Sequence, residues 1–401
     1  MRILMLTSEF LPVRGGIGNY VMELAKRIPN EHELHVAAPK GVFTDSEASV
    51  SSENDASLFP SNVHIHRYGR GGEGLLGNLA FQISCPSILR ALVAKHDIDI
   101  IHTQSQMPDY FVSPRGLETP IVTTVHTTVE GHNRTLWSPQ IDRRDMNGSE
   151  RLVLVGGPLL IAMERRYYTN QRHYISVSEW GRRDLVAEKR VNPERTRTIY
   201  IGVDTMRFSP GKKEDAKGFL SNIASTGNPK ILFLSRMATR KGINVLLKAI
   251  PRVQEKVDAE FIIGGPGRLP PGDLPKEGCS YIGYLDPRKV PYMYALSDVY
   301  VLPSMFENFP ACLLEAMASG CVPLSTTVCG IPEMIESGQN GILIPPNDVE
   351  ALVKSIVGLV DDRSLRVKLA TNARKTVEIK FDWGRTVAQT VKYYEDIVED
   401  H

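Results

Sequence analysis

The sequence is poor in cysteine, with five in 401 residues, and these five have neither an even number nor the spacing of a disulfide framework or a metal site. It also has almost no excess charge, since the formal net charge is +1 and no long run of one sign stands out. No apolar stretch is long enough to cross a membrane. These absences argue against a disulfide-rich secreted domain, a nucleic-acid-binding protein and an integral membrane protein.

What is present is the composition of an ordinary globular protein, with 42% hydrophobic and 23% charged residues. A length of 401 residues is enough for two domains. The apolar run at 1–7 is too short for a signal peptide and leads into Ser8 and Glu9, so it reads as the first strand. We therefore expect a cytoplasmic protein. Peripheral contact with the inner face of a membrane is left open.

Short apolar runs alternate with helical patterns along the chain, which predicts parallel sheets covered by helices on both faces. The first set of expected strands is 3–6, 34–37, 63–67, 98–101, 121–125, 174–177 and 198–201, with helices at 20–28, 87–94 and 159–168. After a predicted hinge at 202–211, the second set is 231–234, 260–263, 280–282, 299–302, 322–325 and 341–344. The prediction is an α/β protein with two doubly wound, Rossmann-like domains.

The most informative stretch is 303–320, which follows an expected strand. Pro310 suits the first position of a helix, and Gly320 suits its C-terminal stop. A helix beginning at Pro310 is therefore predicted, with Glu307 and Asn308 in the loop before it. The first free amides, from Ala311 onward, would point back into this loop, where a phosphate finds donors and a favourable dipole.

Glu315 lies about one and a half turns into this helix, roughly 7–8 Å from its start at ~1.5 Å per residue. That is about the reach from a diphosphate to the ribose of the same nucleotide, and a carboxylate can accept both ribose hydroxyls. The spacing therefore suits a nucleotide-sugar, with Glu307 at one end and Glu315 at the other. The alternative is an ordinary amphipathic helix with a loop carboxylate and one solvated glutamate.

This segment resembles the paired-glutamate motif of the retaining glycosyltransferases of family 4 (glycosyl transferases group 1), and the likeness continues through 330–336 and 340–348. The resemblance implies the GT-B fold, in which two Rossmann-like domains face each other across a cleft. The acceptor domain would be 1–203, joined by a returning C-terminal helix at 383–401, and the donor domain would be 204–382.

The implied reaction moves a hexosyl group from a UDP- or GDP-linked sugar to a hydroxyl acceptor with retention, in glycan, glycolipid or polysaccharide synthesis. No metal or other cofactor is expected. The acceptor class stays open: a lipid-linked glycan, a polysaccharide, a lipid head group or a small molecule. In this scheme Glu315 holds ribose, and Glu307 positions the sugar; whether Glu307 is also a nucleophile is left open. The backbone of the intervening loop contributes too, through Asn308, Phe309, Pro310, Ala311 and Cys312.

A basic loop at 235–242 follows the first strand of the second half. Arginine offers a planar fork to phosphate and lysine a compact point charge, although such a loop alone is more often a solvated surface. Because it matches the family's motif, Arg236 and Lys241 are assigned as catalytic ligands of the diphosphate that stabilise the leaving nucleotide. Arg240 is assigned to the surface.

His126 ends the strand at 121–125, and the loop at 14–19 follows the first strand. A lone histidine is usually a structural hydrogen-bonder, but the family's histidine contacts the transferred sugar. The loop is not Gly-x-Gly-x-x-Gly, which disfavours a Rossmann oxidoreductase. A turn without a ligand is an equal alternative there, and the resemblance adds Gly15 and Gly16 as amides near donor and acceptor.

Gly265 and Tyr284 are further substrate-binding candidates by resemblance, near the nucleoside and its base. Asp97 and Asp99 imitate a metal motif, but they precede a strand and are interpreted as a strand-entry turn.

An acceptor or membrane-facing surface could be formed by Leu75, Leu76 and Phe81 with the cluster at 165–168, although ordinary core and solvated arginines are the favoured interpretation.

Three rival functions share parts of this pattern. A sugar-nucleotide epimerase has the same architecture, but the paired glutamates argue against it. A pyridoxal-dependent phosphorylase needs a Schiff-base lysine pocket, which no segment suggests. A non-catalytic sugar-nucleotide-binding module would keep Arg236, Lys241 and Glu315 yet tolerate the loss of Glu307 or His126. All five are present, which favours an enzyme.

Overall fold

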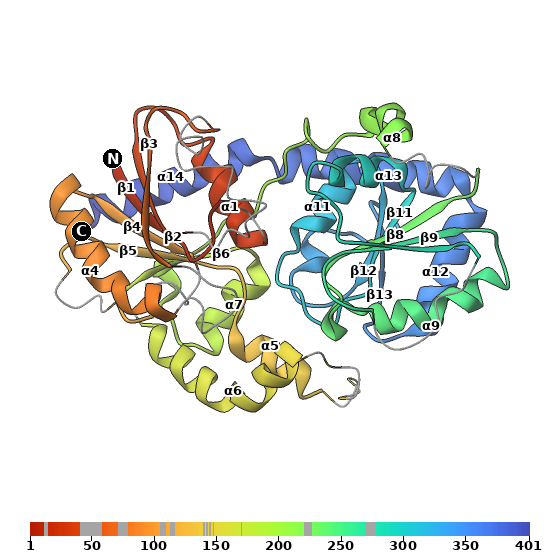
Figure 1. Cartoon of the computed structure of the whole chain (residues 1–401), viewed down its shortest axis with the longest axis horizontal. Helices are drawn as coiled ribbons and strands as arrows, with labels where there is room; N and C mark the ends of the chain where they lie inside the picture. Colours follow the sequence, from red (N-terminus) through yellow and green to blue (C-terminus); the bar gives the residue numbers. More distant parts are fainter. Residues whose placement is uncertain are drawn as a thin grey trace. The chain divides into compact units, whose positions relative to one another are not determined.

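The computed structural model describes residues 1–11, 15–40, 58–70, 79–104, 110–112, 117–138, 141, 143, 146, 148–169, 171–219, 227–269 and 277–401. The chain groups into two compact units (Figure 1). Unit 1 contains Met1–Thr128, Ala162–Ile201 and Trp383–His401, and unit 2 contains Val129–Ile161 and Gly202–Asp382. Residues 129–161 thus group with unit 2, whereas the domain boundaries expected from the sequence assign them to the first domain.

In the described part of unit 1, seven parallel strands form one sheet in the order β3-β2-β1-β4-β5-β6-β7. Their bounds are β1 Arg2–Leu6, β2 Glu33–Lys40, β3 Val63–Arg70, β4 Ile100–Gln104, β5 Ile121–Val125, β6 His173–Ser176 and β7 Thr196–Thr198. The order reverses between β1 and β4, as in a doubly wound sheet, and ligands of such sheets bind beyond the carboxyl ends of the strands.

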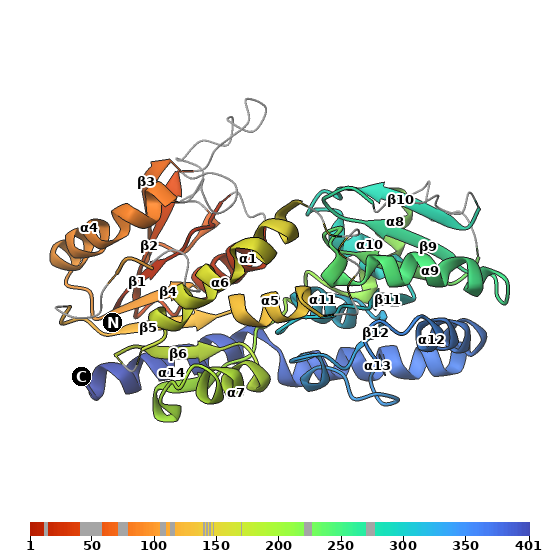
Figure 2. The same cartoon turned by 90° about the horizontal axis from the view of Figure 1, so that it is seen from below.

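The helices that surround this sheet are α1 Gly16–Ala25, α4 Leu79–His96, α7 Glu179–Ala187, α14 Trp383–Glu399 and the 3-10 helix η3 Pro193–Arg195. Helix α6, Gly148–Tyr167, contributes its last residues to unit 1. One face of the sheet is covered by α4, which lies beside β3 in both views (Figures 1 and 2). Its buried Phe81 and Leu89 pack against Leu4 and Leu6 of β1.

The described strands of unit 2 form a second parallel sheet, in the order β10-β9-β8-β11-β12-β13. Their bounds are β8 Lys230–Leu234, β9 Glu260–Gly264, β10 Cys279–Gly283, β11 Val299–Leu302, β12 Val322–Thr326 and β13 Ile342–Ile344. The reversal of strand order between β8 and β11 repeats that of unit 1. The loops that follow β8 and β11 therefore meet at the carboxyl edge of the sheet.

The α-helices of unit 2 are α5 Val129–Leu136, α8 Lys213–Phe219, α9 Ile243–Gln254, α10 Val290–Leu296, α11 Ala311–Ala318, α12 Val349–Asp361 and α13 Arg363–Lys380, with the 3-10 helices η4 Pro210–Lys212, η5 Thr239–Lys241 and η6 Ile331–Glu333. Helix α9 packs with α12 on one face of the sheet, and α11 packs with α13 on the other (Figure 1).

Several predicted boundaries in unit 1 are wrong. Helices α4 and α6 begin before Pro86 and Pro158, which lie inside them, and not at 87 and 159. Strand β7 begins at Thr196 and ends before the apolar residues Ile199 and Ile201, which are buried in the core beyond the strand. Helix α1 begins at Gly16 rather than at Tyr20, because residues of the glycine loop already adopt helical angles.

Candidate functional site

The loop after β8 in unit 2 is held against the loop after β11. Gly242 ends the first loop with φ 76°, and a Cβ added there would lie 1.9 Å from the carbonyl oxygen of Pro303. Only glycine permits this approach without a shift of the backbone. In addition, the Met305 amide donates to the carbonyl of Arg240 at 2.8 Å. The basic loop is therefore fixed beside the loop that carries Glu307.

Glu307 is surrounded by cations. Its carboxylate forms ion pairs with Nζ of Lys241 and with Nη1 of Arg240, the latter at 3.1 Å. Glu307 and Lys241 are each only 8% exposed. Burial raises the pKa of Glu307, but the positive charges of Lys241, Arg240 and Arg236 outweigh burial, so that the net shift of the pKa is downward. An ionised carboxylate within a positively charged cluster thus stands just before α11.

The assignment of Arg240 to the solvated surface is wrong. The residue is half-buried, binds Glu307, and its backbone N–H donates to the carboxylate of Glu150 at 3.3 Å. The tight turn η5 brings its side chain towards the loop after β11. By contrast, Arg236 is exposed, although its charge still acts on both Glu307 and His132.

His132 on α5 belongs to the same cluster and was not among the predicted site residues. Its ring stacks on Phe306, with centroids 6.5 Å apart and planes 5° from parallel. Burial, and then the charges of Arg240 and Arg236, lower the pKa of His132 to about 4, so the ring is neutral near pH 7. No local spacing marks this histidine, because only the fold brings α5 to the loops of unit 2.

Helix α11 starts one residue later than predicted, at Ala311. Pro310 has an extended ψ of 111°, so it precedes the helix, and its carbonyl accepts the first helical hydrogen bond from Leu313 at 3.0 Å. Pro310 itself supplies no side-chain hydrogen bond to cap the helix. The amides of Ala311 and Cys312 therefore belong to the group at a helix start that needs a partner outside the helix.

The remaining residues of the motif are placed as follows. Asn308 and Phe309 are buried, with 6% and 5% exposed. Burial raises the pKa of Cys312 to about 11, which keeps its thiol protonated and fits a packing residue. Glu315 is half-buried on α11, near enough to Tyr294 for its charge to raise the pKa of that residue, after burial.

Gly265 and Tyr284 follow the strands β9 and β10, at the same carboxyl edge of the unit 2 sheet. Gly265 has φ 131°, and an added Cβ would lie 1.9 Å from the carbonyl oxygen of Ser235, so packing alone requires a glycine here. Its N–H donates to the carbonyl of Gly283 at 2.7 Å. Tyr284 follows β10 and is 68% exposed.

In unit 1, His126 follows β5 at the carboxyl edge of the sheet. Its Nε2 donates to Oε1 of Gln104 at 3.0 Å, and its ring meets the ring of Tyr20 edge-on with centroids 5.0 Å apart. Burial lowers the pKa of His126 to about 4, so the imidazole is neutral near pH 7.

A line of hydrogen bonds continues behind His126. Nε2 of Gln104 donates to Nε2 of His102 at 3.1 Å, and Nδ1 of His102 bonds to the hydroxyl of Tyr394 on α14. Since Nε2 of His102 is an acceptor, Nδ1 carries the proton and donates to the tyrosine. Burial, and then the charge of His126, lower the pKa of His102 to about 3, which keeps it neutral. These buried residues were not predicted from the sequence.

The glycine loop contacts a carboxylate of its own unit. The N–H of Gly15, which precedes α1, donates to Glu9. Gly16 opens the helix and has space around it, because nothing lies within 4 Å of an added Cβ. Glu9 at the amino end of α1 is a feature that sequence patterns did not reveal.

Comparison with known proteins identifies the family. The model of Glycosyltransferase Family 4 matches residues 14–207, and that of Glycosyl transferases group 1 matches residues 219–376. The chain belongs to this glycosyltransferase family. It is 24% identical, over 98% of its length and 97% of the relative, to the GDP-mannose-dependent alpha-(1-6)-phosphatidylinositol monomannoside mannosyltransferase of Mycobacterium tuberculosis.

Solved structures confirm the predicted GT-B fold for this glycosyltransferase. Sucrose-phosphate synthase from Thermosynechococcus elongatus matches with a TM-score of 0.76 and 19% identity, covering 100% of both chains. HepE of Anabaena, solved in complex with UDP-glucose, matches with a TM-score of 0.69 and 19% identity, covering 99% of this chain and 100% of HepE.

The interpretation of Asp97 and Asp99 as a strand-entry turn agrees with the structure of this glycosyltransferase. Asp97 and Asp99 form the expected strand-entry turn at the amino end of β4: Asp99 accepts the N–H of Arg2 at 2.6 Å, and Asp97 pairs with Nη1 of Arg2 at 2.9 Å. Within the described residues, no helix has the length and apolar character needed to span a membrane.

The favoured interpretation of the aromatic residues Phe81, Tyr167 and Tyr168 as ordinary core, and not as an acceptor or membrane-facing surface, is confirmed. Phe81 is fully buried in the core against β1, and Tyr167 and Tyr168 are 5% and 6% exposed. Leu75 and Leu76 lie outside the described residues.

Proposed function

We propose that this glycosyltransferase binds a UDP- or GDP-linked hexose in unit 2 and transfers the hexosyl group, with retention, to a hydroxyl acceptor. The observation that carries the proposal is the convergence of Lys241, Arg240 and Glu307 just before the start of α11. Cations and helix-start amides attract a diphosphate, and an ionised carboxylate accepts hydrogen bonds from sugar hydroxyls.

Each residue has a role in this proposal. Lys241 and Arg236 stabilise the negative charge that develops on the leaving nucleotide. The amides of Ala311 and Cys312 donate to the diphosphate, together with the backbone from Asn308 to Pro310. Glu315 accepts the ribose hydroxyls.

Lys241 can hold Glu307 and the diphosphate at the same time. An ammonium group has three donors, and the contact with Glu307 uses one of them. Donor binding therefore adds an anion to a cluster in which positive groups exceed negative ones around Glu307. Glu307, kept ionised by its neighbours, then positions the sugar ring.

The reaction proposed is a same-face displacement. The bond between the anomeric carbon and the phosphate oxygen breaks while the acceptor oxygen bonds to the same face, and the leaving phosphate takes the proton of the acceptor hydroxyl. This route needs neither a protein nucleophile nor a metal. Gly265 and Tyr284 complete the proposed contacts to the nucleoside.

We assign residues 1–203 with 383–401 to an acceptor domain and 204–382 to a donor domain. His126 would contact the transferred sugar as a neutral donor or acceptor, with Gly15 and Gly16 nearby in the first domain. The names of the mannosyltransferase relative and of the HepE complex support a hexose donor and a role in glycolipid or polysaccharide synthesis.

Thermal unfolding with UDP-, GDP- and ADP-sugars tests the donor site. A ligand at 100 times its Kd stabilises the folded state by about 2.7 kcal/mol, which gives a clear rise in Tm. We expect a rise with at least one nucleotide sugar, its loss in Lys241→Ala and Glu315→Ala, and its retention in Lys248→Ala, an exposed lysine on α9. No rise with any of these nucleotides would contradict the donor site.

Product analysis tests the chemistry. With the donor identified, the anomeric configuration of the product, read by NMR, should match that of the donor. An inverted product would contradict the retaining reaction, and transfer by Glu307→Ala at the wild-type rate would contradict the role of Glu307.

A further inference from the structure

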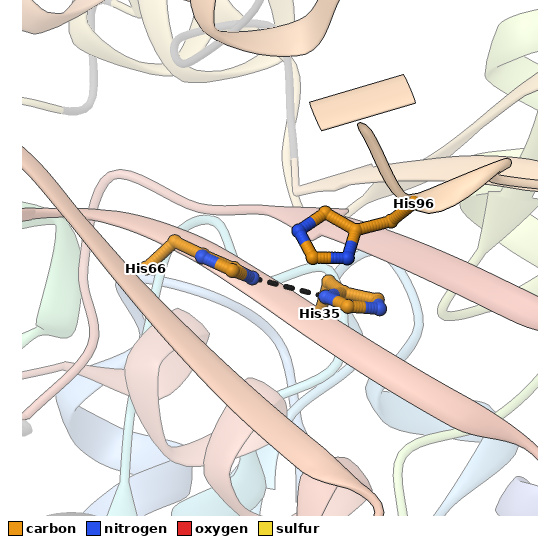
Figure 3. Close-up of side chains that lie close together, drawn as sticks. All are labelled: His35, His66 and His96. Carbon is orange, nitrogen blue, oxygen red and sulfur yellow. Dashed lines mark hydrogen bonds between the residues drawn. The ribbon is translucent and has the colours of Figure 1, made fainter. Parts of the chain in front are cut away.

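Three histidines converge in unit 1, on the far side of β1 and β4 from His126. His35 lies on β2, His66 on β3 and His96 at the end of α4, and one ring nitrogen of each lies within 4.8 Å of the others (Figure 3). Nδ1 of His35 and Nε2 of His66 are 3.0 Å apart, and the rings of His35 and His96 have centroids 4.2 Å apart. Neither the proposed donor site nor the line of hydrogen bonds behind His126 uses these residues.

We propose that His35, His66 and His96 bind one transition-metal dication of the Zn²⁺ class, with the fourth position taken by water. Three imidazoles and a water are an established donor set for Zn²⁺. With Zn–N distances of about 2.0–2.1 Å, the nitrogens of a tetrahedral site lie about 3.3 Å apart. The pair formed by His35 and His66 is already close to this separation. A small rotation of His96, at the end of its helix, completes the triangle.

The surroundings of His35 and His66 disfavour the charged form of their rings. Burial, and then the neighbouring imidazoles, lower the pKa of His35 to about 4 and lower the pKa of His66. Nε2 of His96 is buried and has no hydrogen-bond partner among the described residues. A buried polar atom without a partner is costly, and coordination would satisfy it.

A carboxylate stands behind the cluster. Oε1 of Glu33 lies 3.2 Å from Nε2 of His35, the ring nitrogen that faces away from His66, a close approach without the geometry of a hydrogen bond. Metal-bound histidines commonly have a carboxylate beside their second nitrogen, which holds the proton there and leaves the other nitrogen for the metal. The same oxygen lies 3.0 Å from Nε2 of the exposed His64, which is not part of the triad. The carboxyl end of α4, next to His96, adds a favourable dipole for a cation.

The site joins β2, β3 and α4, elements that are otherwise connected through the core. Among the described strands, β3 is at one edge of the sheet. The metal would therefore cross-link β3 to the end of α4. It would take no part in glycosyl transfer. A change in metal binding is consequently expected to leave nucleotide-sugar binding in unit 2 intact.

The test uses the untagged full-length chain, treated with chelator and then equilibrated with Zn²⁺ alone. Bound zinc is measured by elemental analysis after dialysis, and Co²⁺ replaces Zn²⁺ for visible absorption spectra. We expect one zinc per chain, a rise in Tm with Zn²⁺, and the strong absorption of tetrahedral Co²⁺. His66→Gln and His96→Gln should lose all three, whereas the matched control His64→Gln, two residues away on the same strand, should keep them.

Several results would overturn the proposal: wild-type chain that binds no zinc, His64→Gln losing zinc as fully as His66→Gln, or both triad variants keeping it. Because His35 is almost fully buried, it is not substituted, and circular dichroism confirms that each variant is folded. If neither triad variant folds, the Co²⁺ spectrum of the wild-type chain decides, since an octahedral spectrum like that of the aqueous ion contradicts a three-histidine site.

Discussion

Lys241 and Glu307 form a buried ion pair that joins the loop after β8 to the loop after β11. Both loops lie at the carboxyl edge of the unit 2 sheet, where doubly wound proteins bind ligands. Arg240 contacts the same carboxylate oxygen, Oε1 of Glu307. The pair is thus a structural element of unit 2 as well as a proposed part of the donor site.

Glu307→Gln should lower the free energy of unfolding at pH 7 by about 3–5 kcal/mol, because it leaves the buried Lys241 and the half-buried Arg240 charged without their partner. The pKa of Glu307 in the folded chain lies below its ordinary value of 4.5, so the stabilisation is fully present above pH 4.5 and is lost as the pH falls through the folded pKa. Urea unfolding at several pH values should show the gap between wild type and variant narrowing below pH 4.5. A gap of equal size at neutral and acidic pH would contradict this explanation.

Gly242→Ala should destabilise unit 2 far more than Gly283→Ala. Both glycines have positive φ, 76° and 61°, so both variants carry a backbone cost of about 1–2 kcal/mol. Only at Gly242 would the new Cβ meet a backbone atom, the Pro303 carbonyl oxygen at 1.9 Å, whereas nothing lies within 4 Å at Gly283. We expect an additional loss of about 1–3 kcal/mol at Gly242, measured by urea unfolding. Equal losses would mean that the contact with Pro303 is not tight.

Tyr394→Phe should lower the free energy of unfolding by about 1–3 kcal/mol, because Nδ1–H of His102 loses its acceptor in a buried place. The matched control is Tyr168→Phe. Its hydroxyl is also buried but has no hydrogen-bond partner among the described residues, so its removal should cost little. Chemical denaturation of the two variants checks the difference, and a larger loss in Tyr168→Phe would contradict the hydrogen-bond assignment.

His102 should make the chain sensitive to acid. Its pKa is about 3 in the folded chain and 6.5 when unfolded, so the unfolded chain takes up a proton that the folded chain does not between these values. This contribution to stability is complete above pH 6.5 and falls by about 1.4 kcal/mol per pH unit towards pH 3. In His102→Gln the dependence of unfolding free energy on pH should be shallower by about that slope over this window. An unchanged slope would show that His102 is protonated in the folded chain.

Much of the fold followed from the sequence because short buried strands are bounded by polar or glycine-rich segments. The strands at 121–125 and 299–302 were predicted with their observed bounds. At 198–201 the apolar run misled the prediction, since Ile199 and Ile201 are core residues that follow a strand. Hydrophobicity reports burial, and it cannot by itself tell where the backbone leaves the sheet.

The candidate site was only partly predictable. Lys241 and Glu307 stand out because charged residues follow buried strands. Arg240 was missed because spacing does not tell which way a side chain points in a 3-10 turn. The contact between Tyr394 and His102 spans 292 residues, and no local pattern contains it. For the histidine cluster, the sequence shows only that His64 and His66 alternate, which places both on one face of a strand. His35 and His96 are far from them in the sequence, and the fold brings them to His66.

The position of α14 bears on the order in which the chain can fold during synthesis. Unit 1 includes residues 383–401. The hydrogen bond between the Tyr394 hydroxyl and His102, and the packing of Trp383 on Tyr20, can therefore form only after residues 202–382 have been translated. Unit 2 does not include α14, so it can fold before α14 has been translated. Its segment 129–161 is translated earlier than the rest of unit 2. The amino-terminal half of this enzyme is therefore expected to emerge from the ribosome first and to reach its final packing last.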